Sequence, residues 1–125
     1  MPHLTLEYSA NLQDLVDIQT LCSGALEAAC STGVLPLPGT RVRAVRCDHF
    51  AIADQKPQNA FIDAHLRIGA GRTAEQKRAI GDAIFKALSE YCSALLAEQH
   101  FAVSLEIREI DPDFSWKNNS IRKRW

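Results

Sequence analysis

The sequence has no excess of charge of either sign and no long apolar run. Its 14 lysines and arginines stand against 15 aspartates and glutamates, which gives a formal net charge of −1. A general nucleic-acid binder needs a basic surplus, so a nucleic-acid partner is not expected. No apolar stretch approaches the roughly 20 residues of a membrane span, and the N-terminus lacks the basic start and apolar stretch of a signal peptide. We therefore expect a cytoplasmic protein without a membrane partner.

Motifs that bind metals or build disulfide frameworks are also missing. The cysteines and histidines are scattered along the chain: Cys22, Cys30, Cys47, Cys92, His3, His49, His65 and His100. No two cysteines form a C-x-x-C motif, and no two histidines are spaced to meet on one face of a helix. Such spacings are typical of zinc and redox sites. We expect buried free thiols and no metal site.

What the sequence does contain is the same order of patterns twice. With 125 residues, 46% of them hydrophobic, the chain is large enough for one domain with a buried core. In the first half, strand, helix and strand patterns cover 2–8, 15–29 and 40–52; in the second half they cover 61–68, 80–95 and 102–110. We interpret residues 1–125 as a single domain, with repeat units at about 2–52 and 60–110 and a tail at 111–125.

This order predicts an α+β fold made of duplicated βαβ units. A crossover helix pairs the two strands of each unit in parallel, so two units predict a four-stranded sheet with two helices on one face. Apolar residues occur on both faces of several predicted strands. That distribution indicates that other copies of the chain cover the open face of the sheet. A ferredoxin-like monomer has the same order of elements and stays an alternative.

Both predicted helices begin with residues that favour a helix start. Asn11 followed by Asp14 predicts the cap of the first helix. Thr73 and Gln76 form a capping box at the start of the second helix. The stretch GAGR at 69–72 immediately precedes that box. Its glycines let the backbone approach a ligand, and a helix N-terminus favours an anion.

The second residue is a proline, and it stands at the start of a strand pattern. If Met1 is removed, Pro2 offers a free secondary amine. An unperturbed terminal amine has a pKa of roughly 7.7–8.0, and burial or nearby cations lower it. A neutral amine held in one direction by its ring can take up a proton and return it, as a general base does. The alternative is that this proline does no more than permit the removal of Met1.

Three arginines and one phenylalanine are the other candidates for a site. Arg41 and Arg43 stand two residues apart on a strand, so they project from one face. Arg72 closes the GAGR link, and an arginine fork matches a carboxylate. Phe50, near the end of the second predicted strand, would form an apolar wall. The alternatives are solvated surface charges for the arginines and core packing for Phe50.

Four stretches of this chain together resemble one known family. MPHLTLEYSANL, GTRVRAVR, LRIGAGRTAEQK and DFSWKNNSIR occur in this order and extend over the whole chain. They are similar to 5-carboxymethyl-2-hydroxymuconate isomerases, which belong to the tautomerase superfamily. The resemblance implies a homotrimer of duplicated βαβ chains, with the sheets facing inward and the helices outside. It also implies a reaction without a cofactor or a metal.

The resemblance further implies a substrate and roles for the candidate residues. The substrate is a dienol with three carboxylates from bacterial homoprotocatechuate (4-hydroxyphenylacetate) breakdown, and the product is the conjugated 2-oxo-3-ene isomer. Pro2 would be the base that moves a proton from the 2-hydroxyl toward carbon five. Arg41, Arg43 and Arg72 would bind carboxylates, and Phe50 would line the site. The second unit begins at Ala60, inside the chain, so one base per chain is expected.

Two other functions stay open at this point. The chain could be another enzyme of the same superfamily, either a 4-oxalocrotonate-type tautomerase or a hydratase/dehalogenase. The latter needs a carboxylate to activate water, for which Glu7 and Glu106 are the candidates. Alternatively, the chain could be a non-catalytic binding module on the same trimeric scaffold. The basic run Arg122 to Arg124 is interpreted as a subunit contact or a solvated end.

Overall fold

Alternating apolar and polar residues make the start of the chain a strand whose two faces differ. In the computed structural model, which describes residues 1–125, strand β1 spans His3–Ser9. Its Leu4, Leu6 and Tyr8 are buried, while the residues between them are partly exposed. The same division holds along β3 (Ala60–Gly69). The predicted starting strand of each unit is therefore confirmed, with its apolar side turned to the core.

Four strands form one mixed sheet in the order β2-β1-β3-β4, with β2 spanning Arg41–Cys47 and β4 spanning Phe101–Ile110. β1 pairs in parallel with β2, β3 pairs in parallel with β4, and β1 and β3 run antiparallel at the centre. The duplicated βαβ architecture is confirmed. Because the two central strands are antiparallel, the units begin at opposite ends of the sheet.

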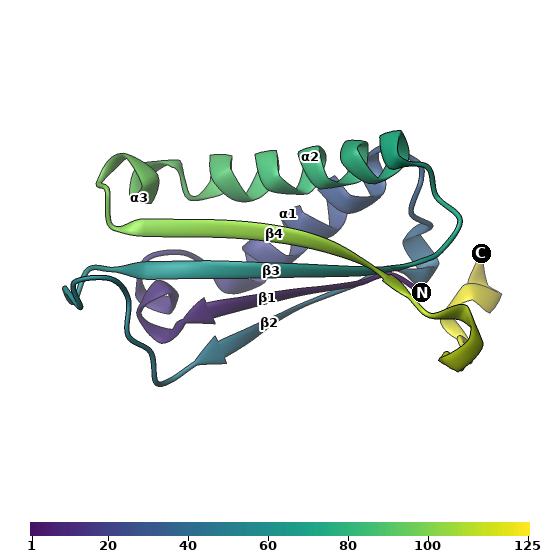
Figure 1. The fold of residues 1–125 in the computed structure, drawn as a ribbon, viewed down its shortest axis with the longest axis horizontal. Helices are drawn as coiled ribbons and strands as arrows, with labels where there is room; N and C mark the ends of the chain where they lie inside the picture. The colour runs from purple at the N-terminus through teal and green to yellow at the C-terminus, as the bar shows by residue number, and fades with distance from the viewer.

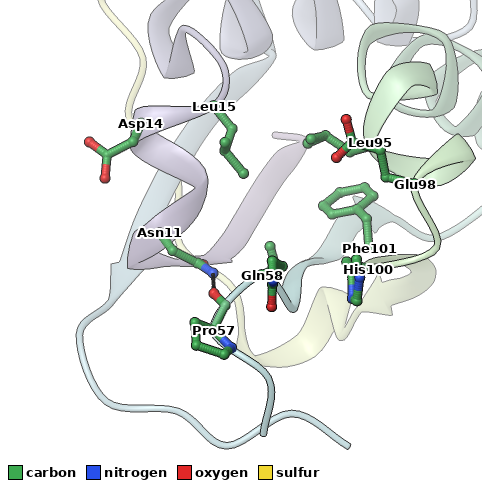
Figure 2. Close-up of a pocket in the computed structure, with 10 residues that line it drawn as sticks. Asn11, Asp14, Leu15, Pro57, Gln58, Leu95, Glu98, His100 and Phe101 are labelled. Atoms are coloured by element: carbon green, nitrogen blue, oxygen red, sulfur yellow. Dashed lines mark hydrogen bonds between the residues drawn. The ribbon is translucent and has the colours of Figure 1, made fainter.

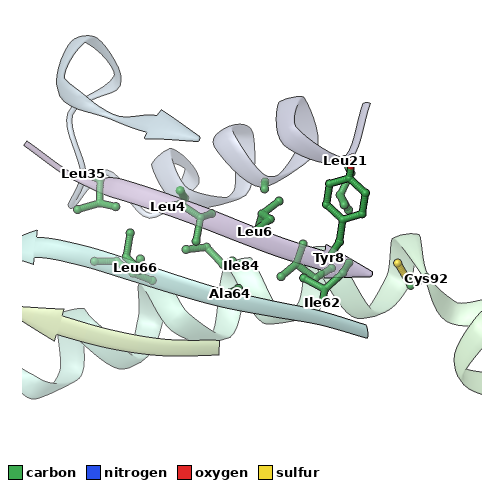
Figure 3. Packing of buried hydrophobic residues seen from close by; sticks show 14 of the residues in the cluster. Leu4, Leu6, Tyr8, Leu21, Leu35, Ile62, Ala64, Leu66, Ile84 and Cys92 are labelled. Atoms are coloured by element: carbon green, nitrogen blue, oxygen red, sulfur yellow. The ribbon is translucent and has the colours of Figure 1, made fainter. Parts of the chain in front are cut away.

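Both long helices lie on one face of this sheet, as Figure 1 shows for α1 (Ile18–Ser31) and α2 (Ala74–Tyr91). Apolar residues from the helices and the two central strands interlock between these layers (Figure 3). Burial of this apolar surface is the main favourable contribution to folding. The side chains at the centre of the core are Leu4, Leu6, Ile62, Leu66, Ile80, Ile84 and Leu88. None of the helices combines the length and the apolar character needed to cross a membrane.

The opposite face of the sheet is open and mostly polar. It carries Glu7, Asp63, His65 and Ser104, and Ser104 Oγ donates a 2.8 Å hydrogen bond to Asp63 Oδ1. The expectation of apolar residues on both faces holds at single positions, since Val45 of β2 and Phe61 of β3 lie on this face. Elsewhere, alternation places most apolar residues of β1, β3 and β4 on the helix side. If other copies of the chain cover this face, they meet charged and polar groups.

The second strand ends earlier than its sequence pattern predicted. β2 stops at Cys47, whereas the pattern extended it to residue 52. β2 is an edge strand whose only partner is β1, and the pairing ends where Ser9 meets Cys47. Beyond that point the chain has no strand to pair with. Phe50 consequently lies in the connection between β2 and β3, and 41% of its surface is exposed.

One predicted helix cap is wrong and the other is confirmed. Asp17, rather than Asn11, caps α1 by accepting a 2.9 Å hydrogen bond from the Thr20 N–H. Asn11 lies in a short 3-10 turn (Ala10–Asp14) and donates through Nδ2 to the carbonyls of Pro57 and Asn59. The capping box of Thr73 with Gln76 forms at the start of α2 as predicted.

The second helical pattern belongs to two helices rather than one. α2 ends at Tyr91, and a short helix α3 covers Ser93–Ala97. Between them Cys92 adopts φ −103° and ψ 20°, which interrupts the helical repeat. Cys92 is also the one fully buried cysteine, and burial raises the pKa of its thiol to about 11. The other three cysteines are only partly buried, so the expectation of buried thiols holds for Cys92 alone.

Removing a buried side chain of α2 should lower the stability of the fold. Ile84 is fully buried in the interface between helices and sheet, so Ile84→Ala removes packed methyl groups and leaves a cavity. We expect a loss of about 2–5 kcal/mol in the free energy of unfolding, measured by denaturant titration. Lys86→Ala is the control, because its side chain is 75% exposed in the same helix and should change stability by under ~0.5 kcal/mol. Equal effects of the two variants would contradict this packing.

Candidate active site

The start of the chain is held at the edge between β1 and β2. The Pro2 carbonyl accepts a 3.1 Å hydrogen bond from the Arg41 N–H, and Pro2 is buried. Gly39 ends a short 3-10 turn (Leu37–Gly39) and, having no side chain, leaves space beside Pro2. A Cβ atom at Gly39 would lie 3.9 Å from Pro2 Cδ and 3.7 Å from an Nη atom of Arg122. The backbone thus fixes the terminus in one place and brings the tail against it.

Cations from three parts of the chain surround the terminal amine. In the structure this amine belongs to Met1, one residue before Pro2. Burial lowers its pKa from the ordinary 8.0, and the charges of Lys117, Arg72, Arg41 and Arg122 lower it further. Desolvation and like charges both disfavour the protonated form. A terminal amine in this position is therefore biased toward the neutral, basic form.

Arg41 and Arg72 are both held at this end of the sheet by backbone carbonyls. Arg41 is the first residue of β2, and its Nη1 donates a 3.2 Å hydrogen bond to the Gly39 carbonyl and contacts Met1 Sδ at 3.2 Å. Arg72 follows β3, and its Nη1 donates a 3.0 Å hydrogen bond to the Gly69 carbonyl. Each guanidinium keeps further N–H groups for a ligand. The structure thus brings two of the predicted arginines to the N-terminus.

Arg43 shares a face with Arg41 but lies one step farther along the sheet. Its Nη1 is 3.3 Å from His3 Nδ1, and the residue is exposed. Burial lowers the pKa of His3, and the charges of Arg67, Arg43 and Arg41 and the terminal amine lower it too. A neutral His3 beside Arg43 extends the polar wall of the site along the open face. Arg43 itself is not among the cations that act on the terminal amine.

Phe50 is not brought to Pro2 within one chain. Its ring meets Phe61 edge-on, with centroids 6.5 Å apart and planes at 78°. Phe61 is near the start of β3, whereas the N-terminus lies beside the end of that strand, where His3 pairs with Arg67. The two regions are at opposite ends of the sheet. A role for Phe50 at Pro2 would require a second copy of the chain.

A cavity of about 240 Å³ opens beside the terminus. One wall is the start of β1 with Met1 and His3, and Arg67 faces it from β3. The tail after β4 closes the other side. The lining from the tail consists of Phe114, Ser115, Trp116 and Lys117. A mixed apolar and cationic lining suits an organic anion.

Lys117 and Arg122 are site residues that the sequence patterns did not identify. Figure 1 shows the N-terminus and the yellow C-terminal tail at the same end of the sheet. Asn119 attaches this tail by donating a 2.9 Å hydrogen bond to the Pro38 carbonyl, 81 residues earlier in the chain. The basic run at 122–124 and the stretch DFSWKNNSIR, which contains both Lys117 and Arg122, are the visible signals, and neither pattern places these residues at the terminus. Their position depends on a long-range contact that has no local pattern.

A second cavity, of about 290 Å³, lies at the other end of the sheet (Figure 2). There the second unit begins at Ala60, which has no free amine. Asp14 and Glu98 border this cavity together with Asn11 and His100, and no lysine or arginine lines it. The two ends of the duplicated fold thus differ in both charge and chemistry. Of these two cavities, the one beside the chain terminus suits an anionic ligand.

Glu7, Asp63 and His65 form the one cluster whose atoms are arranged as a metal ion could use them. One ligand atom from each lies within 4.8 Å of the others, on the open face of the sheet. His65 Nε2 is 2.9 Å from Asp63 Oδ2. The sequence spacing gave no hint of this group, because its members come from two strands. All three are partly exposed, and the cluster lies along the strands away from Pro2.

Comparison with known proteins identifies the family of this chain. The family model described as 5-carboxymethyl-2-hydroxymuconate isomerase matches residues 2–125. A 5-carboxymethyl-2-hydroxymuconate Delta-isomerase of Escherichia coli is 31% identical over 121 residues, which make up 97% of this chain and 96% of the relative.

Solved structures extend the comparison to the fold. A 5-carboxymethyl-2-hydroxymuconate isomerase from Deinococcus radiodurans R1 has a TM-score of 0.91 at 38% identity, covering 98% of this chain and 92% of that one. A fused 4-OT, described as a symmetric trimer, has a TM-score of 0.59 at 20% identity, covering 94% of this chain and 93% of that one. That likeness concerns the fold alone. The match along residues 2–125 and the identity over nearly the whole chain show that this protein belongs to the 5-carboxymethyl-2-hydroxymuconate isomerase family.

Proposed function

We propose that this chain isomerises 5-carboxymethyl-2-hydroxymuconate to its conjugated 2-oxo-3-ene form in homoprotocatechuate catabolism. The Pro2 amine, freed when Met1 is removed, acts as the general base. The observation that carries the proposal is the chain terminus held among Arg41, Arg72, Lys117 and Arg122. The names of the relatives support the substrate. A substrate with three carboxylates is the kind of molecule that such a cluster of cations attracts.

The proposed reaction needs only the movement of one proton and a shift of double bonds. The neutral Pro2 nitrogen takes the proton from the 2-hydroxyl, so the O–H bond breaks and a C=O bond forms at carbon two. The electron pairs shift along the diene, and carbon five takes the proton back from the Pro2 ammonium. The substrate is neither oxidised nor reduced overall. The chemistry therefore requires a base that also acts as an acid, and it requires no cofactor.

The arginines provide binding and electrostatic stabilisation. Arg41 and Arg72 are placed to pair with substrate carboxylates, and Arg43 lies one position farther along the same face as Arg41. Guanidinium groups bind carboxylates through paired N–H donors. As the proton leaves the 2-hydroxyl, negative charge grows on that oxygen. A cation positioned beside it stabilises this charge more in the transition state than in the substrate.

A hydratase or dehalogenase mechanism has less support from the structure. It would need a carboxylate beside Pro2 to activate water, and Glu7 and Glu106 were the candidates. Glu7 stands four residues along β1 from His3, a separation on the order of 13 Å. Glu106 accepts a hydrogen bond from Arg108 on the open face, in register with His65. Neither carboxylate is at the chain terminus.

We also propose that the chain assembles as a homotrimer through the open face of its sheet. The fold is shared with a fused 4-OT described as a symmetric trimer. Assembly would cover the polar face and could bring Phe50 of one chain to the Pro2 end of another. Phe50 would then line the site from a neighbouring subunit rather than from its own.

Light scattering on purified protein tests the assembly. We expect a mass three times the 13.9 kDa of one chain. Because the open face carries ionic groups such as Asp63, high salt should weaken the assembly. A mass of 13.9 kDa at micromolar concentration and low salt would contradict the trimer.

Pro2→Ala tests the base. After removal of Met1, confirmed by intact mass, the variant still ends in an amine, but a primary one without the ring that fixes its direction. We expect kcat for 5-carboxymethyl-2-hydroxymuconate, followed by ultraviolet absorbance, to fall by on the order of 10² or more. Extending the wild-type chain by one residue before Pro2 turns its nitrogen into an amide and should abolish activity. Full activity of either variant, with a wild-type thermal midpoint, would rule out this base.

The pH dependence follows from the lowered pKa of the amine. The base must be neutral, so kcat/KM should rise with pH through the pKa of the amine and then level off. The burial and the four cations that lower the pKa of the Met1 amine from 8.0 should act in the same direction on the Pro2 amine, so the rise is expected at a lower pH than for an unperturbed terminal amine. Arg72→Ala removes one of these cations, which raises the pKa and moves the rise to higher pH. Arg78→Ala, an exposed arginine in α2, is the control and should leave the profile unchanged. An unmoved profile in Arg72→Ala would contradict this account.

A further inference from the structure

The tail after β4 supplies the site with positive charge that the sheet does not contain. Lys117 and Arg122 are both exposed, and both act on the terminal amine together with Arg41 and Arg72. The tail therefore doubles the number of cations at the terminus. Neither residue forms an ion pair with a carboxylate of this chain. Their charges are available to a ligand.

The position of the tail is set by a small number of specific hydrogen bonds. Asn119 Nδ2 donates to the Pro38 carbonyl at 2.9 Å, and Asn119 Oδ1 accepts from the N–H groups of Ile121 and Arg122 at 3.0 and 3.4 Å. One side chain thus joins the tail to the turn before β2 and also fixes the backbone of Arg122. The guanidinium of Arg122 then lies over Gly39, beside Pro2.

Lys117 lies in the part of the tail that precedes Asn119. It lines the cavity of about 240 Å³, together with Met1 and with Arg67 from the sheet. Phe114 and Trp116 of the tail also line this cavity. A short carbon chain that ends in a carboxylate fits such a lining, because the rings contact the carbon atoms and the cations pair with the charge.

We propose that the tail determines the specificity of the site by binding the carboxymethyl carboxylate of the substrate through Lys117 and Arg122. The proposal rests on the proposed function. The carboxymethyl group distinguishes a tricarboxylate dienol from a dicarboxylate one such as 2-hydroxymuconate. Arg41 and Arg72 take the carboxylates that both dienols share. The tail thus selects the longer, more highly charged substrate.

The experiment compares these two substrates in the same variants of the full chain. Lys117→Ala and Arg122→Ala should each raise KM for 5-carboxymethyl-2-hydroxymuconate about 10-fold or more, because each removes a charge-assisted contact. KM for 2-hydroxymuconate should change less than about twofold. Lys117→Arg keeps the charge and should restore most of the discrimination. All rates are measured on the pH plateau, since loss of a cation also raises the pKa of the amine.

Matched controls lie in the same tail. Lys123 is exposed and does not act on the terminal amine, so Lys123→Ala should leave both KM values unchanged. Arg124 stacks over Trp125 at 5.6 Å and serves as a second control. Asn119→Ala removes the attachment to Pro38 and should reproduce the loss of discrimination while both cations remain present.

The outcomes separate this proposal from the proposed function. Equal KM changes for both substrates, or none for either, would overturn the role of the tail while leaving the isomerase intact. Failure of the wild type to convert 5-carboxymethyl-2-hydroxymuconate would overturn the proposed function itself. A substrate-specific KM change in Lys123→Ala would show that total tail charge, rather than Lys117 and Arg122, sets the preference, and would also overturn the assignment.

Discussion

The rest of the site depends on where the chain terminus is held. The hydrogen bond from the Arg41 N–H to the Pro2 carbonyl continues the pairing of β1 with β2 to the first residues of the chain. A terminal segment without such a bond would move freely in solvent. Its amine would then titrate near the ordinary value of 8.0. Held in the sheet, it is partly desolvated and surrounded by cations, which is the condition for a neutral amine near neutral pH.

Duplication explains why one end of the sheet is chemically different from the other. The two βαβ units are related across the antiparallel pair β1 and β3, so each end of the sheet contains the start of one unit. At one end that start is a chain terminus, and at the other it is Ala60, whose nitrogen is an amide that donates to the His100 carbonyl. The cation pattern follows this difference. Arginine and lysine gather at the terminus, whereas Asp14 and Glu98 border the cavity at the other end.

The periodicity of apolar residues predicted the strands and helices of the fold. Where a strand such as β2 ends depends instead on the strand with which it pairs. Alternation identified β1 and β3 because one of their faces is fully buried. It placed the end of β2 too late, because the length of an edge strand depends on β1. Arg41 and Arg72 were found from their places at a strand start and a helix start. Lys117 and Arg122 were not, because the contact between Asn119 and Pro38 joins distant residues.

The cations at the terminus also explain why an anionic ligand would bind there. Four like charges near one partly buried amine repel one another, and no carboxylate of this chain pairs with them. The hydrogen bonds of Arg41, Arg72 and Asn119 to backbone carbonyls hold these groups together in spite of the repulsion. A ligand with several carboxylates reduces this repulsion between the cations when it binds. The fold thus keeps the positive charge in place before the ligand arrives, and such preorganisation lets a site stabilise negative charge without rearranging during the reaction.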